Sequence, residues 1–458
     1  MASDKTSQLF WLQYGDAIRQ KVGVGSGDKI FFLATETQKG PLAGNNVPDA
    51  YTAQGLYNIG NNLLSTNNVF YSPSAFHGYD EAIGRYLTWV ELGGKSNPAL
   101  DSAYLDAVKN QAAFQKSFDN EQDSAHARWR KDTDYGLTDK SFKVWVESGK
   151  APAWQAAKDR VDSISQTITN LQLQQDGPMS VIVKEDRDRL RKGKNEDTDF
   201  DGYNMHAASG NVLSTAELTR KFLSGETIPE PPFHRRPLYE AGSYKQFVQD
   251  AMQKATSSDY SSPQRIDVNI DTGKTTADYN FGQTKGGANV GVSNGWFSFN
   301  AGASHSSESS TLQLGSESSQ VQVAITYNDL QAITITTGAW NVDVSKYKLR
   351  SDAPQEVKSL ARVSQIIVIA GLGYEIKVGA STAEILDTKL KQTTSAGGSI
   401  SVFGIPIGLG GSGSSTKENQ THKTSWDKAS RTFKVVPNFD NNCATVVGVV
   451  AEPFQIKA

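Results

Sequence analysis

The strongest constraint on the fold of this chain is a change in hydrophobic spacing near Pro263. Before this position, apolar residues recur every three to four positions, which is the period of an amphipathic helix. After it, apolar and polar residues alternate, as they do in half-buried strands. We therefore expect an α+β protein, with a mainly helical domain over residues 1–262 and an antiparallel β domain over residues 263–458.

Two apolar stripes of matching period mark the helical part. Asn97 is a suitable N-cap and Pro98 suits a first helical position, while Gly177 and Pro178 suit the end of the second helix. We expect a long antiparallel helical hairpin, although two helices that face one common core would show the same stripes. The stripe residues are Leu100, Tyr104, Ala107, Gln111, Phe114 and Phe118, then Trp154, Ala157, Val161, Ile164, Ile168 and Leu171.

The region after Pro263 predicts a sandwich or a barrel-like domain. The run from Ile366 to Ile369 is continuous and β-branched, which is typical of a central strand. A single β unit can reach the roughly 200 residues of this region. The alternating residues are Val268, Ile270, Val321, Val323, Ile325, Ile333, Ile335, Val342, Val344, Tyr374, Ile376, Val378, Phe433 and Val435.

Two segments of the β region resemble each other. Each opens with a Gly-Gly pair, at Gly286 and at Gly397, and alternates in apolar residues before a turn. The first turns at Ser293-Asn294-Gly295 and the second near Phe403-Gly404, and after the return each becomes rich in Ser or Gly. The stretch from Ser395 to Thr416 contains no charged residue. The pattern indicates two hairpins that arose by internal duplication.

The composition of these hairpins suggests contact with a membrane or a partner. A strand with Val, Ile or Phe on one face and Gly, Ser or Asn on the other can lie between hydrocarbon and water. In composition the pair resembles the insertion hairpins of β-pore-forming proteins, over less than a fifth of the chain. The residues expected to contact lipid or a partner are Val290, Val292, Trp296, Phe297, Phe299, Ile400, Val402, Ile405, Ile407 and Leu409.

The leading functional hypothesis is a defence or toxin-like protein that binds membranes or itself through these hairpins. Their apolar arms are shorter than the about 9 to 11 residues of a tilted transmembrane strand. The alternative is that both hairpins are inner strands of the sandwich, with small residues where the layers approach closely.

Two glycine motifs in the β region do not predict a catalytic or nucleotide site. Residues 291–295 match G-x-S-x-G, but a hydrolase elbow requires a helix after the serine, and Trp296 to Phe299 is a predicted strand. Gly408, Gly410 and Gly413 match G-x-G-x-x-G, but no helix is predicted after them. Ser293-Asn294-Gly295 is better explained as a hairpin turn.

One acidic segment has the beginning of a calcium-binding loop. Asp197, Asp199 and Asp201 are followed by Gly202, as carboxylate ligands and the turning glycine are in such loops. The twelfth position is Ala208 rather than the bidentate glutamate. The sequence leaves open a calcium site completed by a remote carboxylate and a plain acidic loop, and it predicts no organic cofactor.

Charge and cysteine content narrow the remaining alternatives. The 46 basic and 49 acidic residues give a net charge of −3, which argues against a nucleic-acid partner. Cys443 is the one cysteine, so no intrachain disulfide forms, and we expect a cytoplasmic protein without a signal peptide or transmembrane helix.

Two further function classes remain open. One is a cytosolic enzyme without a cofactor, whose acid/base pocket lies between the α and β parts and uses groups such as His77 or His206. The other is a carbohydrate-binding protein that stacks sugars on Trp296, Trp340 or Trp426.

Overall fold

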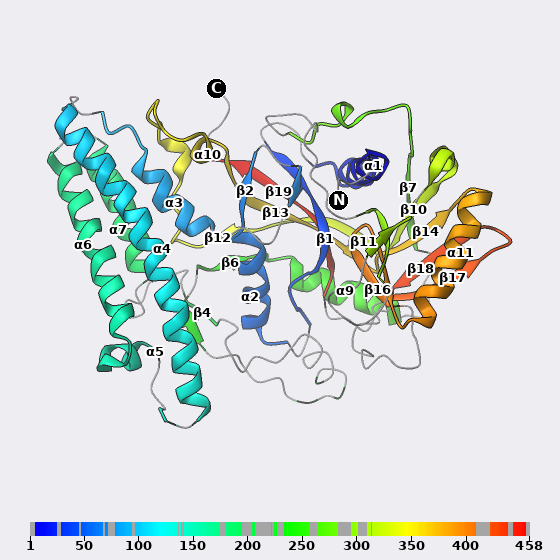
Figure 1. The fold of residues 1–458 in the computed structure, drawn as a ribbon, viewed down its shortest axis with the longest axis horizontal. Coiled ribbons are helices and arrows are strands. Elements are labelled where there is room, and N and C mark those ends of the chain that lie inside the picture. Colours follow the sequence, from blue (N-terminus) through cyan, green and yellow to red (C-terminus); the bar gives the residue numbers. More distant parts are fainter. Residues whose placement is uncertain are drawn as a thin grey trace. The chain divides into compact units, whose positions relative to one another are not determined.

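The computed structural model describes most of the chain. Its described residues are 5–24, 29–44, 47–66, 69–71, 78–93, 97–135, 137–138, 142–174, 179–194, 204–206, 221, 224, 226, 233–235, 237–256, 263–282, 295–300, 309–312, 314–408, 422–437 and 443–454. The fold is α+β, with helices predominating in the N-terminal region and antiparallel sheets in the C-terminal region, as the sequence predicts (Figure 1).

The chain forms two compact units that are interleaved in the sequence. Unit 1 consists of Met1–Ala82, Gly193–Asn341 and Pro354–Ala458, and unit 2 consists of Ile83–Lys192 and Val342–Ala353. The first 82 residues are thus grouped with the β region. Whether residues 1–262 and 263–458 behave as two separate domains stays a prediction.

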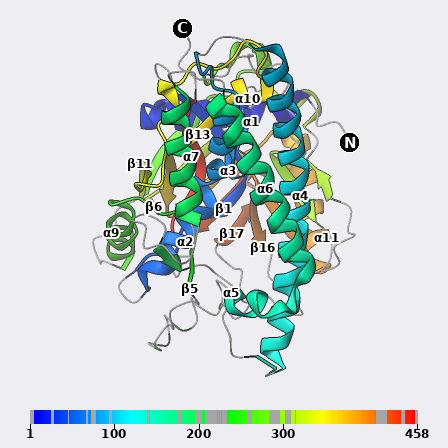
Figure 2. The ribbon, with the colours of Figure 1, turned by 90° about the vertical axis from the view of Figure 1, so that its left-hand side faces the viewer.

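Unit 2 contains the long helical hairpin. Its two arms, α4 (Pro98–Asp134) and α6 (Pro152–Gln174), pack side by side (Figure 2). Asn97 Oδ1 accepts a hydrogen bond from the backbone N–H of Ala99 at 3.2 Å, so the predicted N-cap is present. Gln111 Nε2 donates to Ser165 Oγ at 3.2 Å, and Phe118 contacts Trp154. Later residues of one arm therefore meet earlier residues of the other, as in an antiparallel pair. The helices are α4 (Pro98–Asp134), α5 (Phe142–Trp145), α6 (Pro152–Gln174) and α7 (Ser180–Lys194).

A six-stranded sheet runs through unit 1. The predicted central strand at Ile366 to Ile369 is confirmed, because β13 pairs with β11 on one side and with β19 on the other. Its strands, in spatial order, are β11 (Asp329–Thr334), β13 (Leu360–Ala370), β19 (Thr445–Pro453), β1 (Ile30–Lys39) and β3 (Phe70–Tyr71), with β2 (Leu63–Ser65) also paired to β13.

A second sheet has five strands, all antiparallel to their neighbours. In β10, Val323 and Ile325 are buried as predicted and Gln322 is exposed, but Ala324 between them is buried too, so the strict alternation of a half-buried strand is not kept. Val344 begins a 3₁₀ turn, Val344–Lys346, where a strand was expected. The strands in spatial order are β17 (His422–Asp427), β18 (Thr432–Pro437), β14 (Gly373–Lys377), β10 (Gln322–Tyr327) and β7 (Gln264–Val268).

The third sheet of unit 1 has four strands and contains the described parts of both predicted hairpins. Its order is β16 (Ile405–Gly408), β15 (Ser399–Val402), β8 (Phe297–Asn300) and β9 (Ser309–Thr311). We call it the hairpin sheet. Two small ladders complete the strands: β12 (Thr336–Thr337) with β6 (Tyr239–Glu240), and β4 (Asn204–His206) with β5 (Phe233–Arg235).

Several helices accompany these sheets. α11 packs against β8 and β15 of the hairpin sheet. One continuous buried cluster joins apolar residues of α1, α11 and all three large sheets, so the hairpin sheet shares the main core of unit 1. The helices are α1 (Lys5–Val22), α2 (Asp49–Gly60), α9 (Tyr244–Thr256), α10 (Gln355–Lys358) and α11 (Ala380–Ser395), while α3 (Tyr79–Thr88) crosses from unit 1 to unit 2.

Candidate functional site

The second predicted hairpin pairs with β8, the described return strand of the first predicted hairpin. β8 has β15 on one side and β9 on the other, so the pairing of Phe297–Asn300 expected within the first hairpin is wrong; the other expected arm, residues 288–292, lies outside the described residues. β15 and β8 are antiparallel neighbours, with Ile400 opposite Phe299 and Val402 opposite Phe297. β15 then turns into β16, where Ile400 lies opposite Ile407. The similar segments thus form one sheet, and the apolar residues of three strands share one face of it.

That apolar face points into the protein. Every described hairpin residue predicted to contact lipid or a partner has a buried side chain, and several are fully buried. The expectation that these side chains are available at the surface of the folded chain is therefore wrong for this conformation. Their exposed fractions are Trp296 1%, Phe297 0%, Phe299 3%, Ile400 0%, Val402 0%, Ile405 3% and Ile407 1%. Val290, Val292 and Leu409 lie outside the described residues.

The opposite face of the hairpin sheet is polar and uncharged. Ser399 and Ser401 alternate with the buried residues of β15 and are partly exposed, as is Asn300 of β8. Ser298 lies directly opposite Ser401 but is buried, at 8% exposed. Small hydroxyl and amide groups therefore make up this face, which is only partly open to solvent.

The turn of the second hairpin is also buried. Phe403 and Gly404 have φ values of 44° and 75°, as the two central residues of a type I′ hairpin turn do. A bulky side chain is uncommon at positive φ, because its Cβ crowds the backbone. Phe403 is nevertheless 0% exposed. The turn thus holds a conformation unfavourable for phenylalanine while it places that ring in the core.

A group of aromatic rings encloses Phe403, and we call it the aromatic cage. Tyr14 of α1 stacks on Phe403 with ring centroids 4.1 Å apart and an interplanar angle of 8°. Trp11, also from α1, meets the ring edge-on at 5.3 Å. Trp296 and Tyr374 complete the cage at 5.6 and 5.8 Å. α1 therefore contributes two of the four rings that contact Phe403.

The cage also contains a buried pair of phenols. The hydroxyl oxygens of Tyr14 and Tyr374 are 3.0 Å apart and share a hydrogen bond. Burial raises the pKa of Tyr14, although the bond from Tyr374 partly offsets this, and burial likewise raises the pKa of Tyr374 well above its ordinary value. Both side chains therefore stay neutral throughout the physiological pH range.

Hydrogen bonds of the backbone N–H groups link α1, the start of β8 and the turn of the second hairpin. The N–H of Trp296 donates to Ser7 Oγ of α1 at 3.0 Å, and the N–H of Phe403 donates to the carbonyl of Trp296 at 2.7 Å. Phe10 stacks on Trp296 at 4.7 Å. Release of the second hairpin would break the link from Phe403 to Trp296 but would leave the link from Trp296 to α1.

The residues of α1 were not predicted from sequence as part of this site. The predicted turn near Phe403 and Gly404 is confirmed, but no role was predicted for Phe403. A usable signal was present: Phe10, Trp11 and Tyr14 place aromatic rings on neighbouring turns of one helix. Tyr374 gave no such signal, because an aromatic residue in an alternating strand is common.

The other sites predicted from sequence receive no support from the described residues. Asp197, Asp199 and Asp201 lie outside them, and the described part contains no group of three or more side chains suited to a metal ion. His77 and the side chain of His206 are also outside the description.

The tryptophans proposed to stack on sugars differ in exposure. Trp296 and Trp340 are 1% and 0% exposed, so neither ring is presented to a sugar in this structure. Trp426 is partly exposed, and its Nε1 donates to Asp387 Oδ1 at 3.2 Å. A sugar-binding platform built from all three is therefore not present in this conformation.

Comparison with known proteins gives no further guide to the site. No protein-family model, curated protein or solved structure matches this chain. Within the described residues, every helix is too short or too polar to span a lipid bilayer. The function must therefore be argued from the hairpin sheet itself.

Proposed function

We propose that the protein acts on lipid membranes by releasing the β15–β16 hairpin from its place beside β8 and inserting it into the bilayer, as a defence or toxin-like protein would. In this proposal, the conformation described above is a storage form. The observation that carries the proposal is the structure of the hairpin sheet. One face is continuously apolar, the other consists of small uncharged polar groups, and the turn that joins β15 to β16 is held in the aromatic cage.

The length of uncharged chain around the turn suits insertion. No charged residue occurs from Gln392 to Thr416. This leaves about eleven residues on each side of the Phe403–Gly404 turn, which matches the about 9 to 11 residues of a tilted transmembrane strand. Insertion along this length would require the last turn of α11 to unwind, because α11 extends to Ser395.

Energetics favour direct transfer from the core to lipid. Burial of a large apolar side chain contributes about 1.5 to 3 kcal/mol relative to exposure in water. Release of Ile400, Val402, Phe403, Ile405 and Ile407 into water would therefore cost an amount comparable to the whole net stability of a typical domain. The hydrocarbon of a bilayer removes that cost for the apolar side chains. Hairpins from several copies, paired into a closed sheet, would satisfy the backbone groups at their edges there.

The position of β16 at the edge of the sheet favours lipid over a second copy of the chain as the partner of the folded protein. β16 pairs with β15 alone in the described strands, and it contains Pro406. A proline lacks the N–H that an added strand would require, and natural proteins use it to blunt sheet edges. The edge is therefore poorly suited to strand addition by a second copy while the hairpin is in place.

A reversible cross-link tests the proposal. Ser298 and Ser401 lie directly opposite each other in β8 and β15, so the Ser298→Cys/Ser401→Cys variant in a Cys443→Ser background would lock the two strands together. We expect the wild-type protein and the reduced variant to release dye from phosphatidylcholine/phosphatidylserine vesicles, and the oxidised variant to release none.

The matched control is Lys423→Cys/Val436→Cys in the same background, because these residues are also opposite each other but lie on β17 and β18. This cross-link should leave dye release unchanged. Equal leakage from the oxidised and reduced hairpin variants, or no leakage from the wild-type protein, would overturn the proposal. Self-association in the absence of lipid, if the hairpin lock blocks it, would assign the hairpin to assembly instead.

A further inference from the structure

The distal end of the α4–α6 hairpin in unit 2 contains a second concentration of aromatic residues. α5 lies at this end, as Figure 2 shows. Phe142 of α5 stacks on His126 with ring centroids 3.7 Å apart, and it contacts Trp129 and Trp154 at 5.8 and 6.2 Å. Trp145 is 3% exposed, and its Nε1 donates to Asp132 Oδ2 at 3.0 Å. This cluster gives the distal end a rigid apolar base.

Two apolar side chains beside this base are exposed. Tyr135 is 69% and Leu137 is 73% exposed, the highest values for large hydrophobic residues in the described part of the chain. Tyr135 follows the last turn of α4, and Lys131 Nζ lies 5.9 Å from the centroid of its ring. Scattered exposed apolar residues are normal, but here the two are adjacent to each other and to basic side chains.

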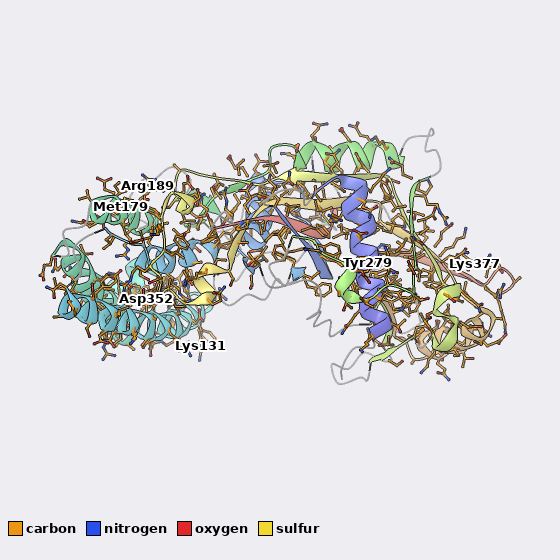
Figure 3. All side chains as sticks on the ribbon, turned by 90° about the horizontal axis from the view of Figure 1, so that it is seen from above. Lys131, Met179, Arg189, Tyr279, Asp352 and Lys377 are labelled. Carbon is orange, nitrogen blue, oxygen red and sulfur yellow. The ribbon has the colours of Figure 1, made fainter. Side chains whose placement is uncertain are left out.

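The distal end has a small excess of basic residues in a protein whose net charge is −3, because residues 128–150 contain six Lys and Arg against four Asp and Glu. Arg128, Arg130, Lys131 and Lys150 are exposed. Figure 3 labels Lys131 in the last turn of α4. The acidic side chain described beside them, Asp132, is half-buried and accepts the hydrogen bond from Trp145. The described surface there therefore presents basic side chains together with the side chains of Tyr135 and Leu137.

We propose that this distal end docks on an anionic lipid surface, with Tyr135 and Leu137 in the interfacial region and the basic side chains on phospholipid head groups. Aromatic side chains favour the interface because one end of the ring is apolar and the other is wet. A basic side chain near an anionic membrane contributes about 1 kcal/mol, which corresponds to roughly a fivefold change in partitioning. Exposed Leu137 favours lipid over nucleic acid, whose backbone offers it no apolar contact.

This inference deepens the proposed function by naming a docking surface and a lipid class, and it rests on the membrane as the target. Its test measures binding rather than leakage, so the two can fail separately. The probes are vesicles of phosphatidylcholine alone and vesicles with about one third phosphatidylserine. The full chain is used throughout, including the oxidised Ser298→Cys/Ser401→Cys variant, whose hairpin is locked.

Three variants define the expected pattern. Arg130→Gln/Lys131→Gln should lower binding to the anionic vesicles about 25-fold. The matched control, Lys109→Gln/Lys116→Gln, removes the same charge from exposed positions elsewhere on α4 and should change binding less than twofold. Tyr135→Ser/Leu137→Ser should lower binding to both kinds of vesicle. All three change exposed residues, so unfolding midpoints should stay close to that of the wild type.

The outcomes separate the two proposals. The locked protein should still bind anionic vesicles while it releases no dye. Equal losses in the distal variant and its control, or equal binding to both kinds of vesicle, would overturn the docking surface and leave the hairpin proposal standing. Tighter binding to a single-stranded RNA oligonucleotide than to anionic vesicles would replace lipid as the partner. Failure of the wild-type protein to bind any vesicle would end both.

Discussion

The hairpin sheet and the distal end of the α4–α6 hairpin are both rich in aromatic residues, but they use them in opposite ways. In the aromatic cage, Phe403 is 0% exposed and no charged side chain takes part. At the distal end, Tyr135 is 69% exposed and stands beside basic residues. Under the proposed function, this difference has a physical reason: a few exposed apolar residues can make the first contact with lipid, whereas the larger apolar face of an inserting hairpin would have to stay buried until an apolar environment is available.

The largest expected effect comes from removal of the cage's central ring. Phe403→Ala should lower the free energy of unfolding by about 3 to 5 kcal/mol, because it leaves a cavity between α1 and the hairpin sheet. Leu137→Ala, the matched change at the distal end, should stay within about 0.5 kcal/mol, because Leu137 is 73% exposed. Urea unfolding followed by circular dichroism measures both.

The same residue tests whether the turn is strained. Phe403→Gly should be about 1 kcal/mol less destabilising than Phe403→Ala, because glycine adopts positive φ without the Cβ penalty. If the two variants unfold at the same denaturant concentration, the turn does not hold the left-handed conformation in solution.

A medium effect is expected from the buried phenol pair. Tyr14→Phe leaves the Tyr374 hydroxyl in the core without its partner and should cost about 1 to 3 kcal/mol. The double variant Tyr14→Phe/Tyr374→Phe removes both polar groups and should recover most of that loss. A double variant as unstable as the sum of the two single ones would show that the pair contributes no coupled hydrogen bond.

The pH dependence of this pair follows from the direction of its pKa shifts. Burial raises both pKa values above the ordinary 10.0, so the neutral phenols favour the folded state. The wild-type free energy of unfolding should be insensitive to these groups below pH 10 and should fall as the pH rises above that value. The double phenylalanine variant should lose less stability over this alkaline range.

The sequence was informative where a pattern had one physical explanation. Asn97 and Pro98 located the start of α4, and the β-branched run from Ile366 to Ile369 located a strand paired on both sides. The strand β1 was missed, because its Ile30–Ala34 run is too short to be distinguished from a buried helix by periodicity. A strand from the first 40 residues that pairs with one near the C-terminus requires long-range contacts, which local patterns do not contain.

The direction of the hairpins' apolar face could not be derived from alternation. A strand with apolar residues on one face has the same alternating sequence pattern whether that face contacts lipid, a partner or the core of its own chain. Here the deciding contacts come from Trp11 and Tyr14, almost 400 residues away in sequence from Phe403. The predicted hairpin turn was therefore found, but its burial was not.

The smallest effect concerns α11, which packs against β8 and β15 of the hairpin sheet. Glu317 receives hydrogen bonds from the N–H groups of Ser381 and Thr382 and from the Thr382 hydroxyl, at 3.1, 2.8 and 2.8 Å, in the first turn of this helix. Bonds from Ser381 and then from Thr382 lower the pKa of Glu317 to about 2. A lowered pKa means that the ionised carboxylate favours the folded state. This contribution to stability is lost as the pH falls from 4.5, the ordinary pKa of a glutamate, toward 2.

Glu317→Gln should thus lower the melting temperature slightly near neutral pH, and the difference from the wild type should vanish at about pH 2. Glu384→Gln, an exposed substitution in the same helix, is the control. If acid also weakens the packing of α11 on the hairpin sheet, dye release by the wild type should increase below pH 4.5, and the increase should be smaller in Glu317→Gln. A difference in melting temperature between the two proteins that does not depend on pH would show that the carboxylate does not cap this helix.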